Sequence, residues 1–215
     1  MAARVVPDGA AGRRAAVATL LEGGVVGIPT DTVYGIAVAL GTAAGVERLF
    51  EVKARPPDKA VMVLVDGLDQ LADWVELSAA AKALSTMWPS GLTLVLPLRA
   101  GAPLPAALTA GTQTLGVRIP KHDVPRALAR AVGPLPTTSA NPSGASEARS
   151  AQEVLATLGE RIELILDGGP SEGGVPSTIV DCSIARPRIL RPGAIGADRL
   201  AAVLDAAGLE HDLRP

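Results

Sequence analysis

Polar residues gather in six short stretches of an otherwise apolar chain, and their side chains are of the types that bind anions. The six stretches read "PTDTVYG" (29–35), "VKARPPDK" (52–59), "TLGVRIP" (114–120), "TTSANPSG" (137–144), "VPSTIVD" (175–181) and "RILRPG" (188–193). They supply basic residues and hydroxyls with few carboxylates. Arginine binds phosphate through paired hydrogen bonds, and loops of small polar residues cradle phosphate. Together the six stretches predict a site for a polyanionic substrate.

The basic stretch at 52–59 places Lys53, Arg55 and Lys59 around two prolines. Pro56 favours an extended backbone at Arg55. A stiff loop that holds cations suits phosphate oxygens, which arginine binds in bidentate fashion and lysine as a point charge. A charge cluster of this kind is more often a solvated surface loop. The stretch therefore does not decide between the two by itself.

Arg118 stands in an apolar segment that has the pattern of a strand. A buried guanidinium needs an anionic partner, which is either a carboxylate of the protein or one of the substrate. We expect "TTSANPSG" to form a loop, which either cradles phosphate or makes a turn before a helix. "PTDTVYG" either makes a simple turn or presents its hydroxyls and Asp31 to a ligand at the ends of strands.

The composition excludes several classes of protein. The net charge is −2 and aromatic residues are 2% of the chain, which argues against a surface that binds nucleic acid through phosphates or base stacking. Cys182 is the single cysteine, so an intrachain disulfide is impossible, and with two histidines a transition-metal site is not expected. With neither a signal-peptide pattern nor an apolar run of membrane-spanning length, we expect a cytoplasmic protein.

Hydrophobic periodicity alternates between helical and strand spacing, which predicts an α/β fold. We expect helices over 10–22, 42–53, 78–87, 123–132, 150–158 and 198–207, and loops over 100–105 and 168–176. Strands are expected over 25–29, 33–40, 60–65, 92–98, 115–120, 162–169, 177–182 and 188–193. Several strands follow one another without a helix between them. A single domain over 1–215, built on a twisted, mixed parallel and antiparallel open sheet flanked by helices, fits this order best.

The six stretches, in this order over about residues 15–195, resemble the YrdC-like family. Its main members are threonylcarbamoyl-AMP synthases, and the chain resembles their short, single-domain form. The resemblance implies formation of threonylcarbamoyl-AMP and pyrophosphate from L-threonine, bicarbonate and ATP. It implies Mg²⁺ carried with ATP and held by no protein cage. It also implies a separate transferase complex that uses the product to modify tRNA, with weak or no direct tRNA binding by this chain.

The resemblance also implies roles for individual residues. Lys53 and Arg55 are the expected catalytic residues, and Asp31 is either a base or a carboxylate that stabilises its turn. The residues expected to bind threonine are Thr32, Arg118, Thr138 and Ser177. The residues expected to bind the nucleotide are Arg55, Lys59, Thr114, Ser139, Asn141, Ser143 and Arg191. Some relatives carry a histidine in the strand that here reads "VMVLV", which leaves one threonine contact unassigned.

Two other functions fit the sequence less well. One is a paralogue in the same superfamily that handles carbamoyl-adenylate, and such domains usually stand beside acylphosphatase-like and zinc-finger segments. The other is an RNA-binding regulatory module that uses a concave face. The acidic composition and the small number of aromatic residues weigh against the second function.

Overall fold

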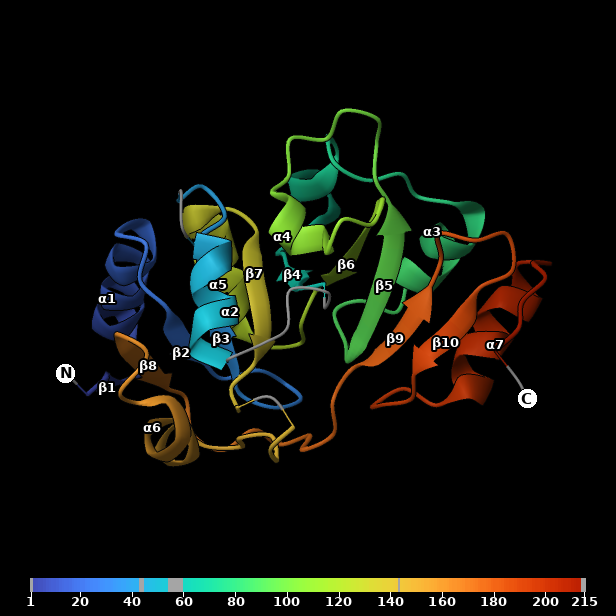
Figure 1. The fold of residues 1–215 in the computed structure, drawn as a ribbon. Helices are drawn as coiled ribbons and strands as arrows, with labels where there is room; N and C mark the ends of the chain where they lie inside the picture. Colours follow the sequence, from blue (N-terminus) through green and yellow to red (C-terminus); the bar gives the residue numbers. More distant parts are fainter. Residues whose placement is uncertain (1, 43–44, 54–59, 143, 214–215) are drawn as a thin grey trace.

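The computed structural model describes residues 2–42, 45–53, 60–142 and 144–213. Its strands form one ten-stranded sheet in the order β1-β8-β2-β3-β7-β4-β6-β5-β9-β10. The sheet crosses the whole molecule, with β1, β8 and β2 on the left of Figure 1 and β9 and β10 on the right. No helix in the described part of the chain is long and apolar enough to cross a membrane.

The elements are short. The strands are β1 (Arg4–Pro7), β2 (Val26–Ile28), β3 (Gly35–Ala37), β4 (Met62–Leu64), β5 (Leu92–Pro97), β6 (Thr114–Arg118), β7 (Leu135–Ser139), β8 (Leu164–Asp167), β9 (Thr178–Asp181) and β10 (Arg188–Arg191). The helices are α1 (Ala10–Leu21), α2 (Gly45–Lys53), η1 (Leu68–Leu71), α3 (Ala79–Ser85), α4 (Ala106–Thr109), α5 (Asp123–Val132), α6 (Ala151–Leu158) and α7 (Ala197–Ala206).

Parallel and antiparallel pairs alternate irregularly along the sheet. β8 pairs in parallel with both β1 and β2, whereas β7 lies between β3 and β4 and is antiparallel to both. β6 is parallel to β4 and antiparallel to β5, and β9 joins β5 to the edge strand β10. The predicted mixed, open sheet flanked by helices is therefore confirmed.

Helices cover both faces of the sheet, because neighbouring residues of a strand point to opposite faces. On β3, Ile36 belongs to a core cluster shared with α2, α3, α6 and α7, whereas Ala37 belongs to a second cluster shared with α1 and α5. Figure 1 shows α2 and α5 on opposite sides of the middle strands. The middle of the sheet is thus held rigidly from both sides.

The main error of sequence interpretation concerns β7. We expected "TTSANPSG" to be a loop, but Thr137, Thr138 and Ser139 form the end of a central strand. Polar side chains are tolerated there because they are hydrogen-bonded: the Thr137 hydroxyl donates to the Leu135 carbonyl at 2.9 Å, and Thr138 Oγ1 accepts from Lys53 at 3.3 Å. The edge strand β1 and the short helices η1 and α4 were also not predicted.

Candidate active site

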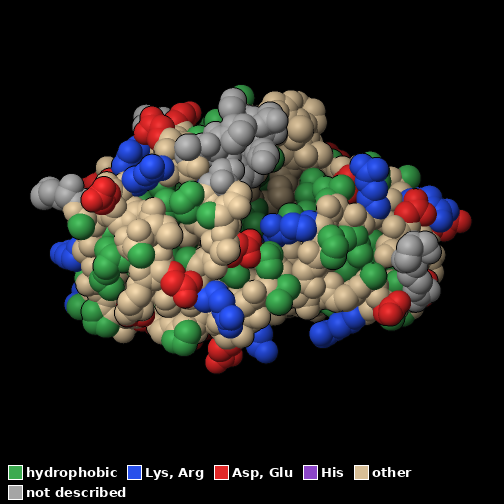
Figure 2. Space-filling model, turned by 60° about the horizontal axis from the view of Figure 1, so that its bottom comes forward, with side chains coloured by type: hydrophobic (Ala, Val, Ile, Leu, Met, Phe, Trp, Pro, Cys, Tyr) green, Lys and Arg blue, Asp and Glu red, His purple; other side chains and the backbone are tan. Residues whose placement is uncertain are grey.

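A cavity of about 310 Å³ lies over the middle of the sheet. Its walls come from strands β3 to β7, β9 and β10, together with the segments that precede β3, β4 and β9 and the Glu147 side chain. Figure 2 shows the hollow near the middle of one face, with a lysine or arginine side chain at its rim. A cavity of this size suits a small-molecule ligand.

Strand alternation on β6 explains why polar side chains reach this cavity. Thr114, Gly116 and Arg118 line it, whereas Leu115 and Val117, between them, are buried in the core. This is the period of two that a strand imposes. The sequence prediction that "TLGVRIP" forms a strand carrying Arg118 is confirmed.

Arg118 is 3% exposed and is already paired within the protein. Its Nη2 donates to Asp31 Oδ1 at 2.5 Å, its Nη1 to Thr32 Oγ1 at 2.9 Å and its Nε to the Ser90 carbonyl at 3.0 Å. Burial lowers the pKa of Arg118, and the Asp31 carboxylate opposes that shift.

This pairing corrects one expectation. Of the two partners proposed for Arg118, the structure shows the protein carboxylate, so the guanidinium does not wait unpaired for a substrate. Arginine has five N–H donors. Three of those of Arg118 are bound as described above, and the other two have no hydrogen bond to a described residue. Arg118 therefore combines a structural ion pair with donors still available to a ligand.

The turn before β3 has a fixed hydrogen-bond polarity. Thr30 Oγ1 donates its single proton to the Val33 carbonyl at 2.7 Å, so Thr32 must be the donor in the 3.0 Å contact between the two threonine hydroxyls. Thr32 Oγ1 also accepts from Arg118. A hydroxyl has one proton and two lone pairs. Thr32 therefore faces the cavity with one lone pair left, and it can only accept a hydrogen bond from a ligand.

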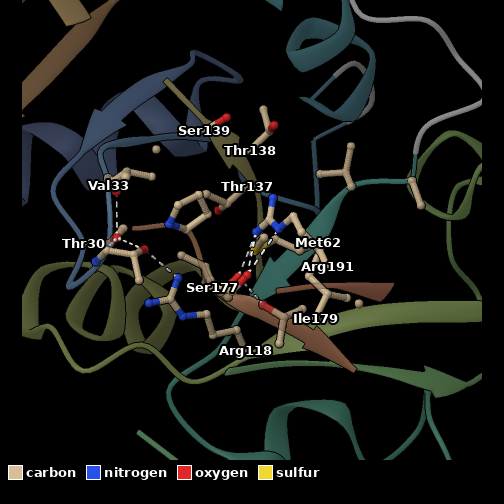
Figure 3. Close-up of a pocket in the computed structure, with 18 of the residues that line it drawn as sticks. Thr30, Val33, Met62, Arg118, Thr137, Thr138, Ser139, Ser177, Ile179 and Arg191 are labelled. Carbon is tan, nitrogen blue, oxygen red and sulfur yellow. Dashed lines mark hydrogen bonds between the residues drawn. The ribbon is translucent and has the colours of Figure 1, made fainter. Parts of the chain in front are cut away.

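The opposite wall of the cavity carries Arg191 and Ser177. Arg191 Nη2 donates to the Ser177 carbonyl at 2.9 Å and to Ser177 Oγ at 3.2 Å. Ser177 Oγ in turn lies 2.8 Å from Thr93 Oγ1. Burial lowers the pKa of Arg191, and the negative charge of Glu147 raises it. Figure 3 shows Arg118 and Arg191 reaching into the cavity from different strands.

Arg191 has no ion pair with any residue that the structure describes, in contrast to Arg118. The two guanidinium groups are close enough that the charge of Arg191 lowers the pKa of Arg118. Two like charges held around one cavity favour an anionic ligand.

Lys53 does not line the cavity, but it holds residues of the cavity wall in place through hydrogen bonds. It ends α2 and is 4% exposed. Its Nζ donates to the Ser139 carbonyl at 2.9 Å, to Ser139 Oγ at 3.1 Å and to Asn141 Oδ1 at 3.3 Å. Because lysine can only donate, Ser139 Oγ is the acceptor, and the Ser139 hydroxyl proton has no acceptor among the described residues. Ser139 lines the cavity and can donate to a ligand.

The structure thus brings together most of the residues singled out in the sequence. Thr32, Thr114, Arg118, Thr138, Ser139, Ser177 and Arg191 line one cavity. Lys53 and Asn141 lie in the hydrogen-bond network that supports it. Arg55, Lys59 and Ser143 lie outside the described residues. Sequence analysis missed Thr93 and Glu147, and it considered Thr30 only as one of the hydroxyls of the stretch 29–35; all three line the cavity. Thr93 carries a detectable signal, because it is a polar residue inside the apolar strand "LTLVLPL".

The acidic groups of the cavity fit a metal ion that arrives with its ligand. Among the described residues, no group of three or more His, Cys, Asp or Glu side chains is arranged to hold a metal ion. Glu147 lines the cavity, and Asp31 is paired with Arg118. Mg²⁺ keeps several waters and usually binds one or two carboxylates together with substrate phosphates. Such an ion would find one carboxylate, Glu147, in this cavity.

Comparisons with known proteins agree on one family. The family model Sua5_yciO_yrdC, described as telomere recombination, matches residues 18–193. The chain is 39% identical to threonylcarbamoyl-AMP synthase of Bacillus subtilis over 92% of its own length and 58% of that protein. It is 41% identical to threonylcarbamoyl-AMP synthase of Xanthomonas campestris over 78% of its own length and 91% of that protein.

A solved structure extends this similarity to the fold. P. abyssi Sua5, solved in complex with L-threonine, superimposes with a TM-score of 0.89 at 31% identity, over 99% of this chain and 63% of that one. The chain therefore spans less than two thirds of the Bacillus and P. abyssi relatives.

Proposed function

The chain belongs to the Sua5–YciO–YrdC family, and on that premise we propose that it is an L-threonylcarbamoyladenylate synthase. It would join L-threonine, bicarbonate and ATP into threonylcarbamoyl-AMP for a downstream tRNA-modifying transferase. The single observation that carries the proposal is the cavity itself. Two arginines and a set of hydroxyls of defined polarity line it, as recognition of a polyphosphate and a small zwitterion requires.

The proposed reaction has two bond-forming steps. The threonine nitrogen attacks the carbon of bicarbonate and water leaves, which gives the N-carboxylate of threonine. An oxygen of this carboxylate then attacks the α-phosphorus of ATP, and pyrophosphate leaves with the electrons of the broken P–O bond. Transfer at phosphorus depends on positioning and on neutralisation of charge. Mg²⁺ bound to the phosphates would neutralise part of that charge.

The hydrogen-bond polarity of the cavity supports a placement of the ends of the substrates. Arg191 and the Ser139 hydroxyl are donors, which suits phosphate oxygens. The two remaining N–H groups of Arg118 suit the threonine carboxylate. Thr32 can only accept, so it suits the amino or hydroxyl group of threonine.

Pyrophosphate release tests the proposal directly. Purified protein is incubated with ATP, Mg²⁺, bicarbonate and L-threonine, and the nucleotide products are analysed by mass spectrometry. We expect pyrophosphate and threonylcarbamoyl-AMP in equal amounts, and we expect both to vanish when threonine or bicarbonate is omitted. Release that continues without threonine would mean that the chain is a different ATP-consuming enzyme.

The two less favoured functions predict different results in the same assay. A carbamoyl-adenylate-handling paralogue would form no threonylcarbamoyl-AMP and would show no dependence on threonine. An RNA-binding module would retain tRNA in a binding assay without ATP and would release no pyrophosphate. We expect neither result.

A further inference from the structure

The segment 168–176, "GGPSEGGVP", was expected to be only a loop between strands. In the structure it makes hydrogen bonds to the turn that carries Asp31 and Thr32. We propose that Ser171, Gly173 and Gly174 of this segment are positioning residues that set the threonine-binding end of the cavity. This inference rests on the proposed function, because it assigns the controlled substrate as threonine. None of the three residues lines the cavity.

Hydrogen bonds hold the turn at both ends. Ser171 is 4% exposed, and its hydroxyl donates to the Thr30 carbonyl at 3.0 Å. The Gly174 amide donates to the Thr32 carbonyl at 2.8 Å. The carbonyls on either side of Asp31 are therefore both bound by the same segment. This fixes the peptide planes on which the Asp31 and Thr32 side chains are mounted.

Glycine lets the two backbones come this close. A Cβ at position 173 would lie 2.5 Å from the Asp31 carbonyl oxygen and 3.2 Å from Thr32 Cα. Gly174 has a φ of 59°, in the region that favours glycine, and a Cβ there would meet the Arg149 guanidinium at 2.7 Å. Direct backbone contact leaves the turn little freedom to shift. Gly173 is therefore needed for space, because its close neighbours are backbone atoms, and Gly174 is needed for its backbone conformation.

The segment is itself anchored at both ends. At its start, the buried Tyr34 hydroxyl donates to the Gly169 carbonyl at 2.7 Å and accepts from the Gly168 amide at 3.3 Å. Burial raises the pKa of Tyr34 to about 12, so the phenol stays a donor at any physiological pH. At its end, the Pro176 carbonyl accepts from the Ala194 amide at 2.8 Å, directly before Ser177. One segment thus links the turn of Thr32 to the wall of Ser177.

The consequence for the site follows from the contacts of Thr32. Its hydroxyl has one lone pair for a ligand only while it donates to Thr30 and accepts from Arg118. A shift of the turn changes both contacts and the 2.5 Å pair between Asp31 and Arg118. Misplacement of a substrate by about 1 Å can cost about a hundredfold in rate. The segment therefore controls threonine use, while the Arg191 wall keeps its own contacts.

The first test substitutes Gly173 with alanine. The backbone at 173 is outside the left-handed region, so Gly173→Ala adds no backbone strain of its own and introduces close contacts with the backbone of Asp31 and Thr32. The control is Gly41→Ala, where a Cβ meets nothing within 4 Å. We expect the threonine KM of Gly173→Ala to rise about tenfold or more while the ATP KM stays within about twofold. Gly41→Ala should match the unsubstituted protein in both.

A milder variant guards against misfolding of the first. Ser171→Ala removes one hydroxyl-to-carbonyl hydrogen bond, and its control, Ser85→Ala, removes the same type of bond on α3, from Ser85 to the Lys82 carbonyl. We expect a severalfold rise in threonine KM for Ser171→Ala only, because only this variant removes a hydrogen bond that holds the turn of Thr32. An equal rise in the KM values for ATP and threonine would overturn the proposal, because it would indicate a general structural defect.

Hydrogen exchange separates this inference from the proposed function. In the unsubstituted protein the Thr32 amide donates to Thr30 Oγ1 at 3.1 Å, and it should exchange slowly. In Gly173→Ala and Ser171→Ala that amide should exchange faster, with no change in β9 or β10. If exchange accelerates but threonine KM is unaffected, the positioning role is wrong. If the unsubstituted protein never uses threonine, the proposed function fails, while unchanged exchange in both variants would refute the link between segment and turn.

Discussion

The two arginines of the cavity differ in how their charge is compensated. Arg118 is 3% exposed and meets the Asp31 carboxylate at 2.5 Å. Arg191 is half-buried, binds the carbonyl and hydroxyl of Ser177, and has Glu147 near it without an ion pair between them in the described part of the chain. The charge of Arg118 is thus compensated within the folded protein, whereas the charge of Arg191 has no ion-pair partner among the described residues. The two arginines of the cavity therefore differ in whether a carboxylate of the protein pairs with them: Asp31 pairs with Arg118, and no described carboxylate pairs with Arg191.

This difference separates stability from affinity. Breaking a buried ion pair leaves a charge without compensation, whereas removing an arginine that lacks an ion pair mainly removes ligand contacts. Substitutions at the Arg118 wall should therefore change the free energy of unfolding of the empty protein. Substitutions of Arg191 should mainly change ligand binding rather than the free energy of unfolding.

The largest expected effect follows replacement of Arg118 with methionine. Arg118→Met leaves Asp31 without its partner, and we expect the free energy of unfolding to fall by about 3–5 kcal/mol, measured by urea denaturation without ligands. The double variant Asp31→Asn with Arg118→Met should recover part of the loss, since neither charge then remains. An unchanged urea midpoint for Arg118→Met would mean that other groups compensate the charge of Asp31. The comparison between the two arginines would then no longer hold.

The next effect concerns Arg191. Arg191→Met should lower ATP affinity about 10- to 100-fold, because hydrogen bonds to charged groups contribute about 1.5–3 kcal/mol. The free energy of unfolding of the empty protein should fall by about 1–3 kcal/mol, less than for Arg118→Met, because the buried Ser177 carbonyl loses its donor. The matched control is Arg188→Met on the same strand; the Arg188 side chain is 60% exposed, and its Nε lies 3.8 Å from Asp181 Oδ2. Calorimetric titration with ATP measures the difference, and equal losses in the two variants would show a nonspecific effect of charge.

The smallest effect concerns the charge beside Arg191. Glu147→Gln removes a negative charge from the cavity, and we expect ATP to bind about two- to fivefold more tightly when Mg²⁺ is chelated, in line with weak ion-pair energies of about 0.2–1 kcal/mol. With Mg²⁺ present the gain should shrink if Glu147 is a ligand of the ion. Glu172→Gln is the control, because Glu172 is exposed and does not line the cavity. Weaker binding without Mg²⁺ would contradict the prediction.

Sequence patterns predicted the parts of the site that depend on local structure. Strand alternation around Arg118 placed that residue on a strand face, and the helix over 123–132 has the predicted bounds. The resemblance over about residues 15–195 agrees with the family match over 18–193. These features depend on periodicity and on short motifs, which lie within a few residues of one another.

The remaining features depend on partners that are distant in the chain. Asp31 and Arg118 are 87 positions apart, and nothing in either motif indicates which carboxylate meets the guanidinium. β7 contains a proline and three residues with hydroxyl groups, so local preference argues against a central strand. It is stable there because Lys53, 85 positions from Thr138, supplies hydrogen bonds. Long-range pairing overrides local preference at both places.

The position of β7 in the sheet has a consequence for the order in which the protein folds. β7 joins β3 to β4 and thereby connects the two halves of the sheet, yet residues 135–139 come late in the chain. During synthesis, β1 to β6 leave the ribosome before the strand that connects them. Pairing between strands far apart in sequence is slow, because loop-closure entropy must be overcome first. The edges of β3 and β4 therefore stay open until β7 inserts between them, and that step brings the turn of Thr32, before β3, against Arg118 on β6.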